Sequence, residues 1–111
     1  MSKSDMKGVH AKPRVFLPWP DELSVFRVAH LPDATVWRIG ERHVARPQGR
    51  NIHGKADVKA DECLKHELAI DADNWPRHHA TVIGWPPSKD ARMSIAQQIA
   101  AAAVVTRSPA A

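Results

Sequence analysis

The clearest strand and helix signals lie in residues 79–105, which read HATVIGWPPSKDARMSIAQQIAAAAVV. Residues 79–84 are rich in β-branched and apolar side chains and have the length of a strand. The following prolines end that strand, and Ser88 is a typical N-cap for a helix from Lys89 to about Val105. Apolar residues recur in this helix at three- and four-residue spacing, which indicates one buried face. We therefore expect a strand, a tight turn and a helix that packs back onto the sheet.

Strand and helix signals are mixed along the rest of the chain. Gly40 stands where a C′ glycine would end a short helix. We expect strands at 23–28, 41–46, 54–60, 68–70 and 79–84, and helices at 33–39, 62–67 and 89–105. This order lacks the regular alternation of a doubly wound parallel sheet. We predict an α+β fold in which two or three helices pack on a small mixed or antiparallel sheet. A single domain spans 13–105, with a flexible basic arm at 1–12 and a frayed tail at 106–111.

Composition limits the chemistry that the chain can support. A chain of 111 residues, 43% of them hydrophobic, has room for one small core. The one cysteine, Cys63, excludes an intramolecular disulfide and a cysteine-rich metal site. The seven histidines show no metal-binding spacing, so we expect no metal, and no motif indicates a cofactor. Four tryptophans against two phenylalanines predict a core rich in indole rings.

Positive charge is concentrated in the first half of the chain. Residues 1–55 hold ten lysines and arginines against five acidic residues, whereas residues 56–111 hold six against seven. Such a surplus favours phosphate backbones or acidic partners. Residues 1–12 contain no apolar run, and no stretch approaches the roughly 18 apolar residues of a membrane span. We therefore expect a cytoplasmic protein without membrane contact, and we leave its oligomeric state open.

Four arginines fall at strict four-residue intervals between residues 38 and 50. On an unbroken helix they would form a basic stripe, as in a recognition helix. Gly40 and the pair Pro47 and Gly49 argue against such a helix. We therefore expect a helix end, a strand and a loop to carry these four side chains, which are Arg38, Arg42, Arg46 and Arg50. They could still form a basic face that contacts nucleic acid through its phosphates.

A second group of arginines and histidines could form a cationic pocket if its strand and loop ends meet. Guanidinium groups bind phosphate with forked donors, and histidine transfers protons near neutral pH. His79 and His53 are the candidate catalytic residues, although no complete catalytic set is present. The candidates for anion or nucleic-acid binding are Arg27, Arg50, Arg77 and His78.

Residues 79–83 resemble the His-x-Thr-apolar signature of the 2H phosphoesterases. The resemblance implies that His79 acts as acid or base and that Thr81 holds a phosphate oxygen. The two would share one strand face, because residues i and i+2 do so. That family has two such motifs. The residues after the other histidines do not supply a second one, which puts the role of His79 in doubt.

A broader pattern resembles short uncharacterised bacterial proteins. It consists of SVFR at 24–27 and RHHA at 77–80, followed by IGWP at 83–86, and the resemblance spans roughly 13–105. It implies one small domain and brings no activity or site residue. We therefore expect a small accessory or regulatory protein that binds a protein partner or a nucleic acid through its basic half. The alternative is a small enzyme for a phosphate-bearing substrate (a phosphoesterase, nuclease or transferase) with an Arg/His pocket.

Overall fold

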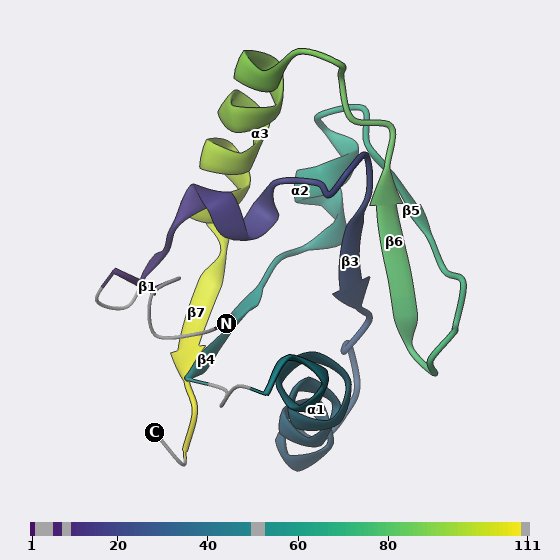
Figure 1. Ribbon diagram of the computed structural model, residues 1–111, viewed down its shortest axis with the longest axis vertical. Coiled ribbons are helices and arrows are strands. Elements are labelled where there is room, and N and C mark those ends of the chain that lie inside the picture. The colour runs from purple at the N-terminus through teal and green to yellow at the C-terminus, as the bar shows by residue number, and fades with distance from the viewer. Residues whose placement is uncertain (2–5, 8–9, 50–52, 110–111) are drawn as a thin grey trace.

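The fold is built around strand β6 (His79–Ile83), which lies between β3 (Leu23–Phe26) and β5 (Ala69–Asp71) and is antiparallel to both. The computed structural model describes residues 1, 6–7, 10–49 and 53–109. Consecutive residues 80–82 of β6 are all buried, so both faces of the central strand are covered. Helices surround these strands (Figure 1), so the predicted α+β class is confirmed, and the sheet is antiparallel.

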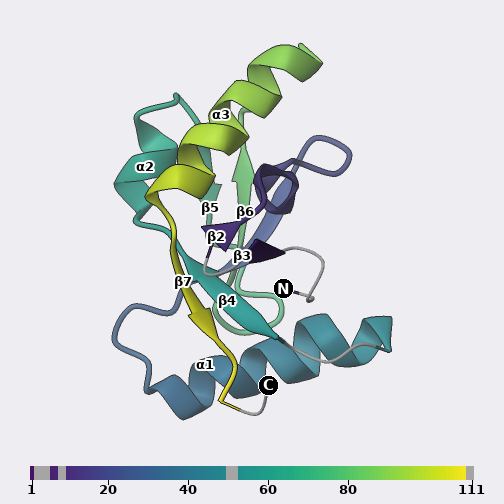
Figure 2. The same ribbon diagram turned by 90° about the vertical axis from the view of Figure 1, so that its left-hand side faces the viewer.

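A second antiparallel pair joins β4 (Gly54–Asp57) to β7 (Val104–Arg107). The preceding helix, α3 (Lys89–Ala102), ends at Ala103, whose backbone is extended. The predictions of a helix to Val105 and of a frayed tail from residue 106 are therefore wrong, because Thr106 and Arg107 pair with β4. Two valines and a threonine favour a strand wherever a partner edge is available, and β4 supplies that edge. Figure 2 shows α3 leading directly into this pair.

The core lies between α3, the 3-10 turn Pro13–Phe16, α2 (Ala60–Leu64) and the central sheet. Ser88 caps α3 as predicted, since its hydroxyl accepts a hydrogen bond from the Ala91 backbone N–H at 3.2 Å. Ile99 is 1% exposed and Val82 is 2% exposed. The buried core residues are Ala11, Phe16, Cys63, Leu68, Val82, Trp85, Ala96, Ile99 and Ala100.

Two tryptophans depart from the expected indole-rich core. Trp85 is buried and donates its indole N–H to the Val82 carbonyl at 3.1 Å. Trp19 and Trp75, in contrast, are 89% and 87% exposed. Apart from Trp85 and Phe16, the core cluster consists of small and aliphatic side chains, and two large aromatic rings stand on the surface.

The N-terminal segment is not wholly a free arm. Strand β1 (Met6–Lys7) pairs with β2 (His10–Ala11), and Ala11 is buried in the core. The N-terminal ammonium of Met1 donates to the Gly54 carbonyl at 2.9 Å. Within the predicted flexible arm at 1–12, these described residues therefore contact the core and β4.

The chain stays helical beyond the last residue of α1 (Asp33–Gly40), contrary to the prediction that Gly40 ends the helix. The chain continues through a π turn (Glu41–Ala45) and a 3-10 turn (Arg46–Gln48), and Gly40 itself is helical at φ −59 and ψ −45. The helix ends at Gly49, which takes the left-handed conformation (φ 63, ψ 31) typical of a C′ glycine. We call residues 33–48 the arginine helix. The predicted strand at 41–46 does not exist.

Pro47 accounts for the change of pitch near the end of the arginine helix. Proline has no backbone N–H, and its ring clashes with the carbonyl four residues earlier in a regular α-helix. The turn before it widens, so that the Arg46 N–H donates to Glu41, five residues back. The proline modifies the last turns of this helix without breaking it.

Two glycine substitutions test where the arginine helix ends. A Cβ on Gly49 would meet nothing within 4 Å, so Gly49→Ala carries only the cost of the left-handed backbone, about 1 kcal/mol. Gly40→Ala should instead raise the free energy of unfolding by roughly 0.5–1 kcal/mol, because glycine weakens a helix interior. Urea unfolding of both variants measures these changes. A destabilised Gly40→Ala together with a stabilised Gly49→Ala would instead place the helix end at Gly40.

Candidate functional site

Three arginines of the arginine helix lie on one exposed side of it. Arg38, Arg42 and Arg46 are all exposed and line one open concavity of about 460 Å³. Four residues overshoot a 3.6-residue turn by about 40°, so a four-residue stripe drifts around a regular α-helix. The wider π turn between Arg42 and Arg46 opposes this drift. We call the three residues the arginine face. The fourth arginine of the sequence pattern, Arg50, lies outside the described residues.

The arginine face keeps a positive surplus. Arg46 and Glu41 form an exposed ion pair at 3.5 Å, a class of pair that stabilises little. The Nε of Arg38 donates to the Ala34 carbonyl at 3.4 Å, which leaves its charge uncompensated. Within the described part of the chain, Arg42 has no ion-pair partner. The lining of this concavity therefore includes three guanidinium groups and one carboxylate.

Aromatic contacts join the arginine helix to the central sheet. The ring of His43 stacks on Phe26 at a centroid distance of 5.9 Å. Phe26 also meets His79 edge-on at 5.3 Å, and the two residues are paired in the register of β3 and β6. His43 lines the concavity of the arginine face. Phe26 thus lies between that concavity and His79.

The loop between β5 and β6 is organised around the Asp73 carboxylate. One oxygen contacts His79 Nδ1 at 2.7 Å, and the other accepts from the Thr81 hydroxyl at 2.8 Å. The first oxygen also accepts from the Trp75 backbone N–H at 3.3 Å. The hydrogen bond from His79, aided by those from Thr81 and Trp75, lowers the pKa of Asp73 although partial burial opposes the shift. The carboxylate stays ionised and holds the loop on β6.

Arg27 and His79, two of the predicted site residues, lie at the same end of the central sheet. The Arg27 backbone N–H donates to the His78 carbonyl at 2.8 Å, and its guanidinium donates to the side-chain carbonyl of Asn74. Arg77 is exposed in the adjoining turn, and His78 has a left-handed backbone (φ 71). These four residues therefore gather around the loop that carries Asp73.

His53, the other candidate catalytic residue, does not join this group. It precedes β4, where its backbone N–H and carbonyl bond Met1 and Ser108. Gly54 next to it pairs with Arg107 in the second sheet, whereas His79 belongs to the first. The predicted pocket therefore lacks His53.

The sequence pointed to His79 and Thr81 on one strand face but not to their partner. Asp73 lies six and eight residues earlier, in a loop where a carboxylate most often caps a turn. Only the pairing of β5 with β6 brings it beside them. A prediction that residues 69–83 form a β-hairpin would have placed Asp73 near His79 and Thr81.

Comparison with models of known families found no match for this sequence. Searches of curated proteins and of solved structures likewise found no significant similarity. Among the described residues, histidine, cysteine and acidic side chains form no group able to hold a metal ion. Within the same residues, none of the helices has both the length and the apolar character that crossing a membrane requires.

The Asp73 network predicts a pH-dependent contribution to stability. Because the pKa of Asp73 is lowered in the folded state, this contribution is complete above the ordinary value of 3.8 and is lost as pH falls through the lowered value. The difference in unfolding free energy between the wild type and Asp73→Asn should shrink as pH falls from the ordinary pKa of 3.8 through the lowered pKa of Asp73. Urea unfolding across this range measures it. A difference that does not change with pH would contradict the assignment.

Proposed function

We propose that this chain is a small cytoplasmic accessory or regulatory protein that binds nucleic acid through its phosphate backbone. The observation that carries the proposal is the arginine face, three guanidinium groups on one side of an uninterrupted helix. Guanidinium groups bind phosphate oxygens with forked donors and keep their charge at any physiological pH. Contacts of this kind position a protein on nucleic acid without reading its sequence.

The dimensions of the arginine face suit such a partner. Arg38 and Arg46 are eight residues apart, which corresponds to about 12 Å along a helix axis. The major groove of duplex DNA is also about 12 Å wide, with phosphates along both edges. The face therefore matches either the two edges of a groove or successive phosphates of one strand. The surplus of positive charge in residues 1–55 supports the same partner by steering a polyanion toward this half of the chain.

An acidic protein is the other partner that the sequence allows. Tight protein interfaces usually centre on aromatic or aliphatic anchors that fill pockets. The concavity of the arginine face is lined mainly by charged and polar residues, with Ile39 as its large aliphatic member. This composition favours a polyanion with regularly spaced charges.

The proposal is tested by fluorescence anisotropy with a labelled 20-base-pair duplex and a labelled 20-nucleotide strand. We expect binding at low salt. The logarithm of the affinity should fall linearly with the logarithm of the salt concentration, with a slope near −3 for the duplex if three phosphates are neutralised. Polyglutamate serves as the competitor that represents an acidic protein. No binding at about 50 mM salt, or stronger competition by polyglutamate than by unlabelled duplex, would overturn the proposal.

The phosphate-substrate enzyme is a second candidate, supported by His79. Its Nδ1 bonds Asp73, and its Nε2 has no hydrogen-bond partner among the described residues. A carboxylate that orients a histidine in this way is common in general bases. The phosphoesterase resemblance implies that the Thr81 hydroxyl binds a phosphate oxygen, but in this structure the hydroxyl donates a hydrogen bond to Asp73. Hydrolysis of a phosphodiester by the wild type and its loss in His79→Gln would support this candidate, and absence of turnover would end it.

A further inference from the structure

We infer that Trp75 is a stacking platform for an unpaired base, so that the protein prefers single-stranded nucleic acid over a duplex. This inference rests on the proposed function and deepens it. Trp75 is 87% exposed at the tip of the β5–β6 loop, although burial of an indole ring would be strongly favourable. Hydrogen bonds hold the backbone of this loop, so the exposed ring is presented to solvent from a fixed point of the fold.

The loop around Trp75 is held on both sides. Asp73 accepts from the Trp75 backbone N–H, while the Asn74 N–H donates to the His79 carbonyl at 3.0 Å. On the other side, the His79 N–H donates to the Pro76 carbonyl at 2.9 Å. The indole ring therefore projects from a backbone that β6 already positions. A backbone held in this way loses little conformational freedom when a planar ligand stacks on the ring that it carries.

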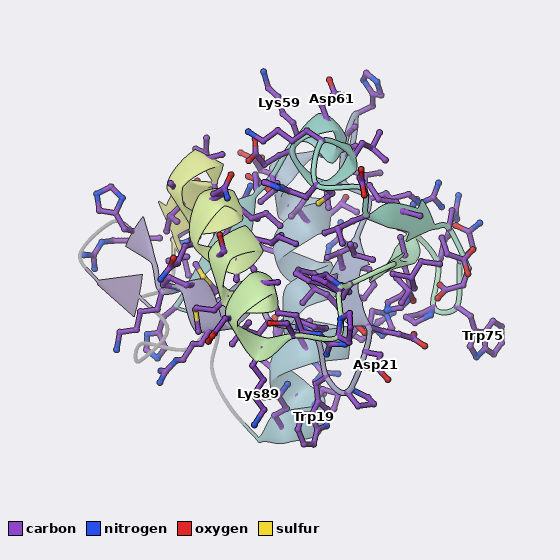
Figure 3. All side chains as sticks on the ribbon, turned by 90° about the horizontal axis from the view of Figure 1, so that it is seen from above. Trp19, Asp21, Lys59, Asp61, Trp75 and Lys89 are labelled. Carbon is purple, nitrogen blue, oxygen red and sulfur yellow. The ribbon has the colours of Figure 1, made fainter. Side chains whose placement is uncertain are left out.

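The loop lies beside the arginine helix. Figures 1 and 2, turned by 90°, both show the β5–β6 loop alongside α1. The rings of His43, Phe26 and His79 connect the helix to the start of β6. Arg27 bonds Asn74, the residue before Trp75, and exposed Arg77 follows two residues after it. A single strand whose phosphates lie on the arginine face would have to extend along this loop for a base to reach the indole, which stands at the edge of the molecule in Figure 3.

Base stacking explains why the ring would discriminate between nucleic acids. Every base has a π face, and aromatic side chains bind unpaired bases through it with little dependence on sequence. The bases of a duplex are already stacked on one another and have no free face along the helix. The arginine face contacts phosphates, which both forms carry, so it contributes to both affinities. Trp75 should contribute to the single-stranded affinity alone.

Trp19 provides a matched control for Trp75. It is 89% exposed, it also precedes a proline, and its labelled side chain stands well apart from that of Trp75 in Figure 3. It precedes β3, and the first residue of β3 is paired with Val82, whereas the loop of Trp75 adjoins His79 at the opposite end of β6. Asp21 lies close by in sequence and forms an ion pair with Arg92 at 2.9 Å. Trp19 therefore lies away from the arginine helix.

The test measures the affinities of a 20-nucleotide oligothymidine and a 20-base-pair duplex for the wild type, Trp75→Ala, Trp75→Phe and Trp19→Ala. Trp75→Ala should weaken binding of the single strand by about 5- to 150-fold, the range for removal of one stacked base, and leave the duplex within about twofold. Trp75→Phe keeps an aromatic face and should retain most of the single-strand affinity. Trp19→Ala should leave both affinities unchanged. Far-UV circular dichroism confirms that each variant is folded.

The outcomes separate this inference from the proposed function. If the wild type binds and Trp75→Ala binds the single strand equally well, base stacking is wrong and binding through the arginine face stands. Equal losses for single strand and duplex would also overturn stacking, since they would indicate a general surface contact. If the wild type binds neither nucleic acid, the proposed function fails and the inference fails with it.

Discussion

Replacing Arg38, Arg42 and Arg46 together by glutamine should lower the affinity for duplex DNA by about 10²–10³-fold at 50 mM salt. Each neutralised phosphate contributes about −0.9 to the slope of log affinity against log salt, so the loss of three contacts removes most of the salt dependence as well. Glutamine keeps the length and helix propensity of the side chain. Fluorescence anisotropy from about 50 to about 200 mM salt measures both quantities.

A second triple variant separates a local site from general attraction to a basic protein. Lys59, Lys65 and Lys89 are exposed, and their replacement by glutamine removes the same charge from the regions of α2 and α3. Figure 3 shows Lys59 and Lys89 on widely separated parts of the surface. We expect an affinity loss below about threefold, because exposed charges farther than a Debye length are largely screened. Equal losses in the two triple variants would contradict the assignment of the site to the arginine face.

Ile99→Ala is expected to cost about 3 kcal/mol of the free energy of unfolding, the largest effect that we predict on stability. Ile99 is 1% exposed and lies in the core cluster on the inner side of α3. Its truncation removes buried apolar surface and leaves a cavity that the neighbouring side chains fill only in part. Small domains are stable by about 5–15 kcal/mol, so the variant should remain folded with a lowered midpoint in urea.

Ile83→Ala deletes the same atoms from an exposed position. Ile83 is 37% exposed at the end of β6, next along the chain to buried Val82. We expect it to cost less than about 1 kcal/mol, because little buried surface is lost and solvent fills the space. Equilibrium urea unfolding of both variants gives the comparison. A cost for Ile83→Ala as large as that for Ile99→Ala would mean that the outer face of β6 is covered in solution.

Local patterns predicted the parts of the molecule in which one element decides its own structure. The hydroxyl of Ser88 caps α3 because a cap needs only the backbone of the next turn. The alternation of residues 79–83 placed His79 and Thr81 on one face, where both now bond Asp73. It could not indicate Asp73 itself, because that carboxylate reaches them only through the pairing of β5 with β6.

The amino-acid order by itself determined the α+β class, the central strand, the cap of α3 and the four-residue spacing of the arginines, since each depends on periodicity or on neighbours within one turn. Tertiary structure decided the rest. Residues 104–107 form a strand because β4 offers an edge, and Gly40 stays helical with the arginine helix continuing to Gly49. Glycine in a helix interior costs only about 0.5–1 kcal/mol relative to alanine, so contacts distant in sequence can keep Gly40 helical. The same contacts decide whether three arginines become one face.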